Sequence, residues 1–77
     1  MNKAYKFYIV YEYIENFINR YGMSERDFCE KCDINIGVFK QIQNPNYSLV
    51  KLIDVMKISY FIKVPISKLV IHLENWN

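Results

Sequence analysis

Two cysteines and one histidine are the side chains of this 77-residue chain whose types most readily hold zinc, and the two thiols could also carry redox chemistry. Cys29 and Cys32 form a C-x-x-C, a spacing found in zinc sites and in redox dithiols. A structural zinc site needs four ligands, and His72 is the only other Cys or His. A redox dithiol of the thioredoxin type needs a βαβ context, which the sequence lacks. Because free cysteine is among the most buried residue types, we expect both thiols to pack in the core.

Other catalytic signatures are missing from the sequence. No Ser-His-Asp arrangement has a suggestive spacing, and Gly22 and Gly37 are too far apart to form a Gly-rich phosphate loop. The carboxylates are scattered along the chain rather than paired. The sequence therefore predicts a protein that is not an enzyme, with no cofactor, no metal and no small-molecule ligand.

Recognition of nucleic acid is the other chemistry that the residue types allow. Gln41 could pair with adenine N6 and N7, and Lys40 could reach guanine or a phosphate. Ile36 could touch a thymine methyl group, and Gly37 would let the backbone come close to a base. The remaining candidates, which would contact the DNA backbone, are Gln43, Asn44, Lys31 and Arg26.

Two short amphipathic helices within residues 24–44 must position these side chains. Ser24 is a natural N-cap for the first helix, with Asp27 three residues later as in a capping box. Asp33 tolerates the left-handed turn that ends this helix, and Asn35 can cap the second. The apolar faces are marked by Phe28, Cys29 and Cys32 and then by Val38, Phe39 and Ile42. Two helices with so short a turn are typical of the motif that places its second helix in the major groove.

Composition and periodicity predict an all-α fold for residues 1–77, a single domain built as a compact five-helix bundle. A chain of 77 residues has room for one core, and its two Gly and two Pro leave few turns for a multi-stranded fold. We expect helices over residues 4–21, twice within 24–44, from about Ser48 to Ile62, and from Ile66 to about Leu73.

Over roughly residues 14–70 this pattern resembles the Xre/Cro-like, phage-repressor type of helix-turn-helix domain. The apolar positions that match the family are Ile14, Phe17, Met23, Phe28, Phe39, Ile42, Val64, Ile66 and Leu69, with Cys29 as its small residue. The turn over residues 33–35 also matches the family pattern. The resemblance implies a lambda-repressor-like fold and a small transcriptional regulator that places its third helix in the major groove of double-stranded DNA.

The chain departs from the family at positions that would face DNA. Glu25 stands where the family often has a Gln that contacts a phosphate, although Arg26 follows it, and Ile18 stands where Arg is frequent. Ile36 and Gly37 occupy positions that are usually polar. A second interpretation therefore stays open, a protein-interaction module that keeps the scaffold without sequence-specific readout.

The aromatic N-terminal segment needs a partner surface. Between residues 4 and 14 only Lys6 and Glu12 are charged, and a helix that is apolar on all sides must be buried on all sides. A homodimer could supply the cover for Tyr5, Tyr8, Tyr11 and Tyr13. Two alternatives remain: Leu73 and Trp76 fold back over the helix, or the segment is a strand that pairs with another subunit.

Charge is distributed unevenly along the chain. Residues 31–73 carry six lysines and two aspartates, whereas residues 1–30 carry four basic and five acidic side chains. Such a basic excess attracts phosphates, although lysines also solubilise exposed helix faces. Since no segment resembles a signal peptide or a membrane-spanning helix, we expect a cytoplasmic protein.

Overall fold

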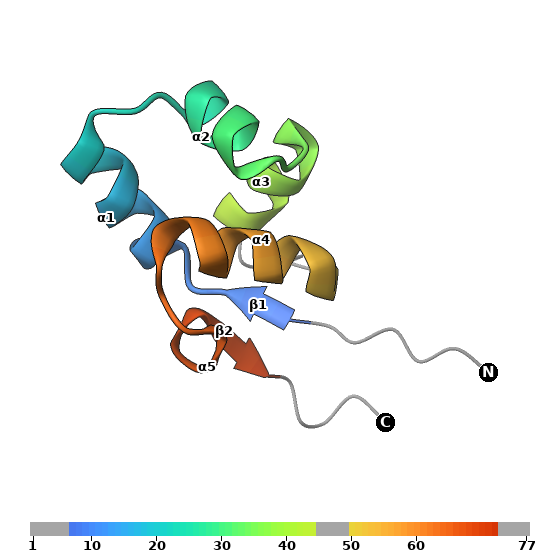
Figure 1. The fold of residues 1–77 in the computed structure, drawn as a ribbon. Coiled ribbons are helices and arrows are strands. Elements are labelled where there is room, and N and C mark those ends of the chain that lie inside the picture. Colours follow the sequence, from blue (N-terminus) through green and yellow to red (C-terminus); the bar gives the residue numbers. More distant parts are fainter. Residues whose placement is uncertain (1–6, 45–49, 73–77) are drawn as a thin grey trace.

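Residues 7–44 and 50–72 are described by the computed structural model (Figure 1). In chain order they form β1 (Phe7–Ile9), α1 (Tyr11–Tyr21), α2 (Glu25–Cys32), α3 (Ile36–Gln43), α4 (Leu52–Ile62), α5 (Ile66–Leu69) and β2 (Val70–His72). This part of the chain is thus a small, mostly helical body with five helices, as expected, and a two-stranded sheet that the all-α prediction lacks.

The segment before α1 is a strand rather than the start of a long helix. β1 pairs antiparallel with β2, so that Phe7 lies opposite His72 and Ile9 lies opposite Val70. Val10 continues the pairing, since its N–H donates to the carbonyl of Leu69 at 2.8 Å. The predicted helix over 4–21 is therefore wrong for residues 7–10, where aromatic and β-branched side chains favour a strand. The strand alternative had the right conformation, but the pairing partner is the same chain.

The last predicted helix is also shorter than its apolar spacing indicates. α5 ends at Leu69, and Val70 has extended backbone angles (φ −116°, ψ 151°) as β2 begins. The prediction that this helix continues to Leu73 is wrong for residues 70–72, while Leu73 itself lies outside the described residues. The competing requirement is the pairing of β1, whose backbone groups need a partner strand.

The helix ends follow the local signals closely. Ser24 caps α2 by accepting from the N–H of Asp27 at 3.0 Å, and Asn35 caps α3 by accepting from the N–H of Gly37 at 2.6 Å. α1 ends at Gly22 with φ 62°, and α2 ends at Asp33 with φ 63°. The predicted roles of Ser24, Asp33 and Asn35 are confirmed. The predicted cap of the fourth helix, Ser48, lies outside the described residues, and α4 begins after Lys51.

The core joins the helices through a cluster of aromatic rings. Phe28 of α2 lies at its centre, with the rings of Phe17, Phe39 and Phe61 at centroid distances of 6.2, 5.7 and 5.6 Å. Phe28 and Phe39 are fully buried, and each such side chain contributes roughly 1.5–3 kcal/mol to folding. α4 contacts both α2 and α5, which ties the α2–α3 pair to the sheet end of the molecule (Figure 1).

Candidate nucleic-acid interface

The α2–α3 pair is built around its buried faces. Phe28, Cys29 and Cys32 of α2 and Phe39 and Ile42 of α3 are buried, as the spacing predicts. Because these faces are fixed, the opposite side of α3 is turned to solvent. This arrangement is what would let α3 approach another molecule.

The predicted contact residues fall into two groups on this surface. Ile36 exposes 48% of its area, and Gly37, Lys40, Gln41 and Asn44 are also exposed, as are Arg26 and Lys31 on α2. Gln43 is different, since it is half-buried. The structure therefore brings seven of the eight predicted DNA contacts to the surface and draws the eighth inward.

The Glu25 carboxylate links side chains of α1, α2 and α3. The Lys40 ammonium group donates to Glu25 Oε1 at 3.0 Å. The Gln43 amide nitrogen donates to Glu25 Oε2 at 2.8 Å and to the Tyr11 hydroxyl at 3.0 Å. These four side chains come from α1, α2 and α3, and we call them the Glu25 network.

The Glu25 network also sets the charge of its carboxylate. The hydrogen bond from Lys40, followed by that from Gln43, holds the pKa of Glu25 below its usual value of 4.5. Glu25 is therefore ionised at neutral pH and largely offsets the charge of Lys40. The sequence could not show this link, because Glu25 and Lys40 lie 15 positions apart on different helices.

Gly37 has a structural role at the start of α3. A Cβ atom at this position would lie 2.9 Å from Oδ1 of Asn35, the atom that caps the helix. The absence of a side chain thus makes room for the cap as well as leaving the backbone accessible. Ile36, the preceding residue, presents an apolar side chain to solvent at the same helix end.

A second lysine is held at the turn between the two helices. The Lys57 ammonium group of α4 lies 3.2 Å from the Asp33 carboxylate and donates to the Asp33 carbonyl at 3.0 Å. Asp33 adopts the left-handed conformation that ends α2, so this contact fastens the turn to α4. Two lysines of the basic segment 31–73, Lys40 and Lys57, thus pair with carboxylates around the α2–α3 pair.

The tyrosines predicted to form a dimer interface are partly covered by their own chain. Tyr8, Tyr11 and Tyr13 are half-buried within their own chain, and Tyr5 lies outside the described residues. The Tyr11 ring packs edge-on against Phe39 at a centroid distance of 5.9 Å, and its hydroxyl belongs to the Glu25 network. Tyr11 therefore has a function inside the fold.

The cysteines pack in the core, as predicted. Both are free thiols and both are buried. Burial raises the pKa of the Cys29 thiol and raises that of Cys32 to about 12. Within residues 7–44 and 50–72, no group of three or more His, Cys, Asp or Glu side chains is arranged to hold a metal ion. No helix in that same part of the chain is long and apolar enough to cross a membrane.

Comparison of the chain with protein-family models, with curated proteins and with solved structures finds no match. What the α2–α3 surface does must therefore be argued from its own residues.

Proposed function

We propose that the chain is a helix-turn-helix protein of the Xre/Cro-like type that binds duplex DNA and regulates transcription. The observation that supports this most directly is the α2–turn–α3 arrangement. Its turn has three residues, both helices have side-chain caps, and the outer side of α3 is exposed. In proteins of this kind the second helix enters the major groove by such a face.

The side chains of α3 would then have distinct roles in the groove. Gln41 suits adenine, because its amide can donate and accept at N6 and N7. Ile36 suits a thymine methyl group, and Gly37 permits a close backbone approach. Lys40 reaches a phosphate or guanine once it exchanges Glu25 for DNA. A good bidentate base contact discriminates by about 1–3 kcal/mol, so one copy of α3 gives modest specificity.

Backbone contacts would come from the neighbouring exposed groups. Arg26 and Lys31 lie on α2, and Asn44 follows the last turn of α3. Gln43 would act indirectly in this scheme, because it holds the Glu25 carboxylate in place. With Arg26, Lys31 and Lys40 each meeting one phosphate, the logarithmic salt slope would be about −2.7.

A titration into mixed-sequence duplex DNA tests the proposal. With three phosphate contacts, affinity should fall about 40-fold between about 50 and about 200 mM salt. Lys40→Gln should weaken binding and reduce the salt slope by about 1. Lys68→Gln, which removes an exposed lysine from α5, is the matched control and should change neither quantity. Failure to bind DNA at low salt would refute the proposal.

Binding as a homodimer would compensate for the modest readout of one subunit. Two copies of α3 on half-sites one DNA turn apart double the contact surface. We propose the outer face of α4 as the contact between copies, because Leu52, Ile53, Met56 and Tyr60 are all exposed there. Met56 lies one turn from both Leu52 and Tyr60. An antiparallel pair of α4 helices would therefore bring Tyr60 of each copy to Leu52 of the other.

The size of the α4 face indicates a weak contact. Four partly exposed side chains cover a few hundred Å², less than the ~800 Å² that each partner buries in a standard interface. Such a pair would associate weakly in solution and gain stability when both copies hold DNA. The same face also favours the second candidate function, a protein-interaction module whose partner is a copy of this chain.

Sedimentation of the free protein and of its DNA complex separates these possibilities. Met56→Glu should abolish the dimer, and Tyr8→Glu should leave it intact. The reverse result would assign the interface to the aromatic N-terminal segment. A dimer without any DNA binding would support the interaction module, and a monomer in both states would refute the homodimer.

A further inference from the structure

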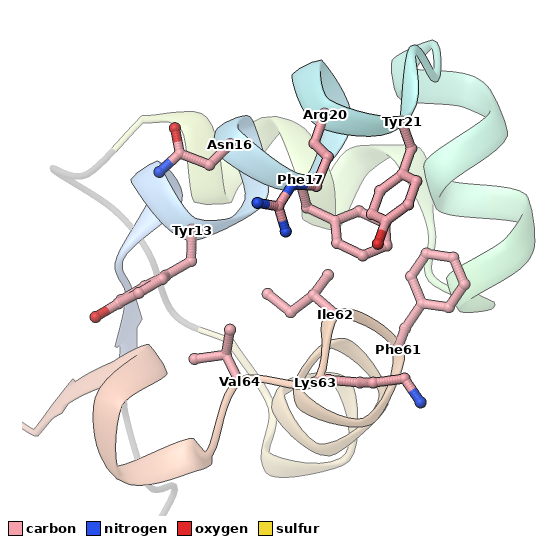
Figure 2. A pocket seen from close by; sticks show the side chains of 9 residues that line it. All are labelled: Tyr13, Asn16, Phe17, Arg20, Tyr21, Phe61, Ile62, Lys63 and Val64. Atoms are coloured by element: carbon pink, nitrogen blue, oxygen red, sulfur yellow. The ribbon is translucent and has the colours of Figure 1, made fainter.

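A pocket of about 670 Å³ lies between α1 and the C-terminal end of α4 (Figure 2). α1 contributes five of its lining residues, and the end of α4 with the following turn contributes the other four. No residue of α2 or α3 lines it. The volume falls within the range of pockets that hold small organic molecules. A ligand here would therefore touch none of the residues of the proposed DNA contact.

Aromatic rings form one wall of this pocket. The Phe17 ring lies between those of Tyr21 and Phe61, at centroid distances of 4.6 and 5.3 Å. Figure 2 shows the three rings side by side, with Tyr13 further along α1. Phe17 and Phe61 are half-buried, and Tyr21 exposes 61% of its area. A planar ligand could therefore stack here without displacing the core.

The polar side chains of the pocket are positively charged or neutral. Arg20 and Lys63 line it, and no Asp or Glu does. In the described part of the chain the lysines that meet carboxylates are Lys40 and Lys57, and neither Arg20 nor Lys63 forms an ion pair. Figure 2 shows Arg20 extending from α1 toward the opposite wall, while Lys63 lies below Phe61. The charge of the site is thus complementary to an anion.

The backbone at Lys63 adds a second observation. Lys63 ends α4 with φ 59°, in the left-handed region. The two other helix ends in this region carry Gly22 and Asp33, whose types adopt it with less strain. A lysine there costs stability that glycine would not, and it adds a positively charged side chain to the residues that line the pocket.

We propose that this pocket binds a small aromatic carboxylate. The ligand ring stacks on the wall of Phe17, Tyr21 and Phe61, and its carboxylate accepts hydrogen bonds from the Arg20 guanidinium. Arginine suits this contact because its planar group can donate two parallel hydrogen bonds to a carboxylate. Lys63 supplies the second positive charge.

Two probes of the same shape test the proposal, 2-naphthoate and the uncharged 2-naphthamide. Each titration of the full chain is measured by the NMR chemical shifts of the backbone amides in α1 and α4. The parent should bind the carboxylate about tenfold more tightly than the amide, since one charge-assisted hydrogen-bond pair contributes on this scale. Arg20→Gln should reduce that preference, and Lys68→Gln should keep it.

Lys63→Gly separates loss of a contact from loss of the fold. This variant should unfold at a higher temperature than the parent, because glycine adopts the left-handed conformation without strain. It should nevertheless bind naphthoate less tightly than the parent, because it lacks the positive charge of Lys63. Equal affinity for the two probes would overturn the proposal. So would a carboxylate preference that is unchanged in Arg20→Gln, or the absence of saturable naphthoate binding at millimolar concentrations.

Discussion

The cations beside α3 and the cations of the aromatic pocket differ in what they meet. Lys40 donates to Glu25, whereas Arg20 and Lys63 line the aromatic pocket and have no ion-pair partner within the described residues. The first arrangement holds the α2–α3 surface in shape but lowers its attraction for anions. The second leaves two exposed positive charges beside half-buried aromatic rings. The difference teaches that net basic charge alone does not locate a binding site.

The two regions also differ in how firmly the core supports them. Beneath the Glu25 network lies Phe39, which is fully buried. At the pocket rim lies Tyr21, which is 61% exposed. Phe39→Ala should lower the free energy of unfolding by about 3–5 kcal/mol, and Tyr21→Ala by less than about 1 kcal/mol. Urea denaturation of both variants measures this, and similar losses would contradict the comparison.

Removing the carboxylate of the Glu25 network should leave Lys40, like Arg20 and Lys63 of the pocket, without an ion-pair partner in the described part of the chain. Glu25→Gln frees Lys40 and removes a charge that repels phosphates, so we expect DNA affinity to rise about fivefold, or about 1 kcal/mol. Asp27→Asn removes a charge from the same first turn of α2 without touching Lys40, and is the matched control. Equal tightening in both variants would mean that net charge, and not the Lys40 contact, limits binding.

Two helix ends test the comparison further, because Gly22 and Lys63 both adopt the left-handed conformation and only Lys63 lines the pocket. Gly22→Ala forces an L side chain into φ 62° and should lower stability by about 1 kcal/mol, although its Cβ would meet no atom within 4 Å. Lys63→Gly should raise stability by about 0.5 kcal/mol. Thermal unfolding measures both changes, and a stabilised Gly22→Ala would contradict the argument.

Acid should erase the contribution of the Glu25 carboxylate to stability. The folded-state pKa of Glu25 lies below 4.5, so its contribution to stability is present above pH 4.5 and is lost as pH falls through the lowered value. The difference in unfolding free energy between the parent and Glu25→Gln should therefore shrink as the pH falls below 4.5. Denaturation between about pH 7 and pH 3 tests this, and a constant difference would rule it out.

Local signals were sufficient to predict α2, the turn and α3. Ser24, Asp33 and Asn35 act on residues within three positions, and the buried face of each helix repeats over a few residues. The strand pair could not be found in this way. Ile9 and Val70 are paired although most of the chain separates them in the sequence. The spacing of the apolar residues around each of them also fits a helix.

The candidate site was predicted in its exposed residues but not in its electrostatics. The exposure of Lys40 and Gln41 follows from helical geometry once Phe39 and Ile42 point inward. The link from Gln43 to Tyr11 spans 32 positions, and no periodic pattern encodes it. The pocket likewise depends on how the end of α4 packs against α1, which only the folded chain reveals.

The register of the strand pair has a mechanical consequence. The described chain enters β1 at Phe7 and leaves β2 at His72, and these two residues lie directly opposite each other. A force that pulls on both ends would therefore unzip the ladder one rung at a time instead of shearing all rungs together. Single-molecule stretching should show the sheet parting first at low force, while the helices around Phe28 remain folded.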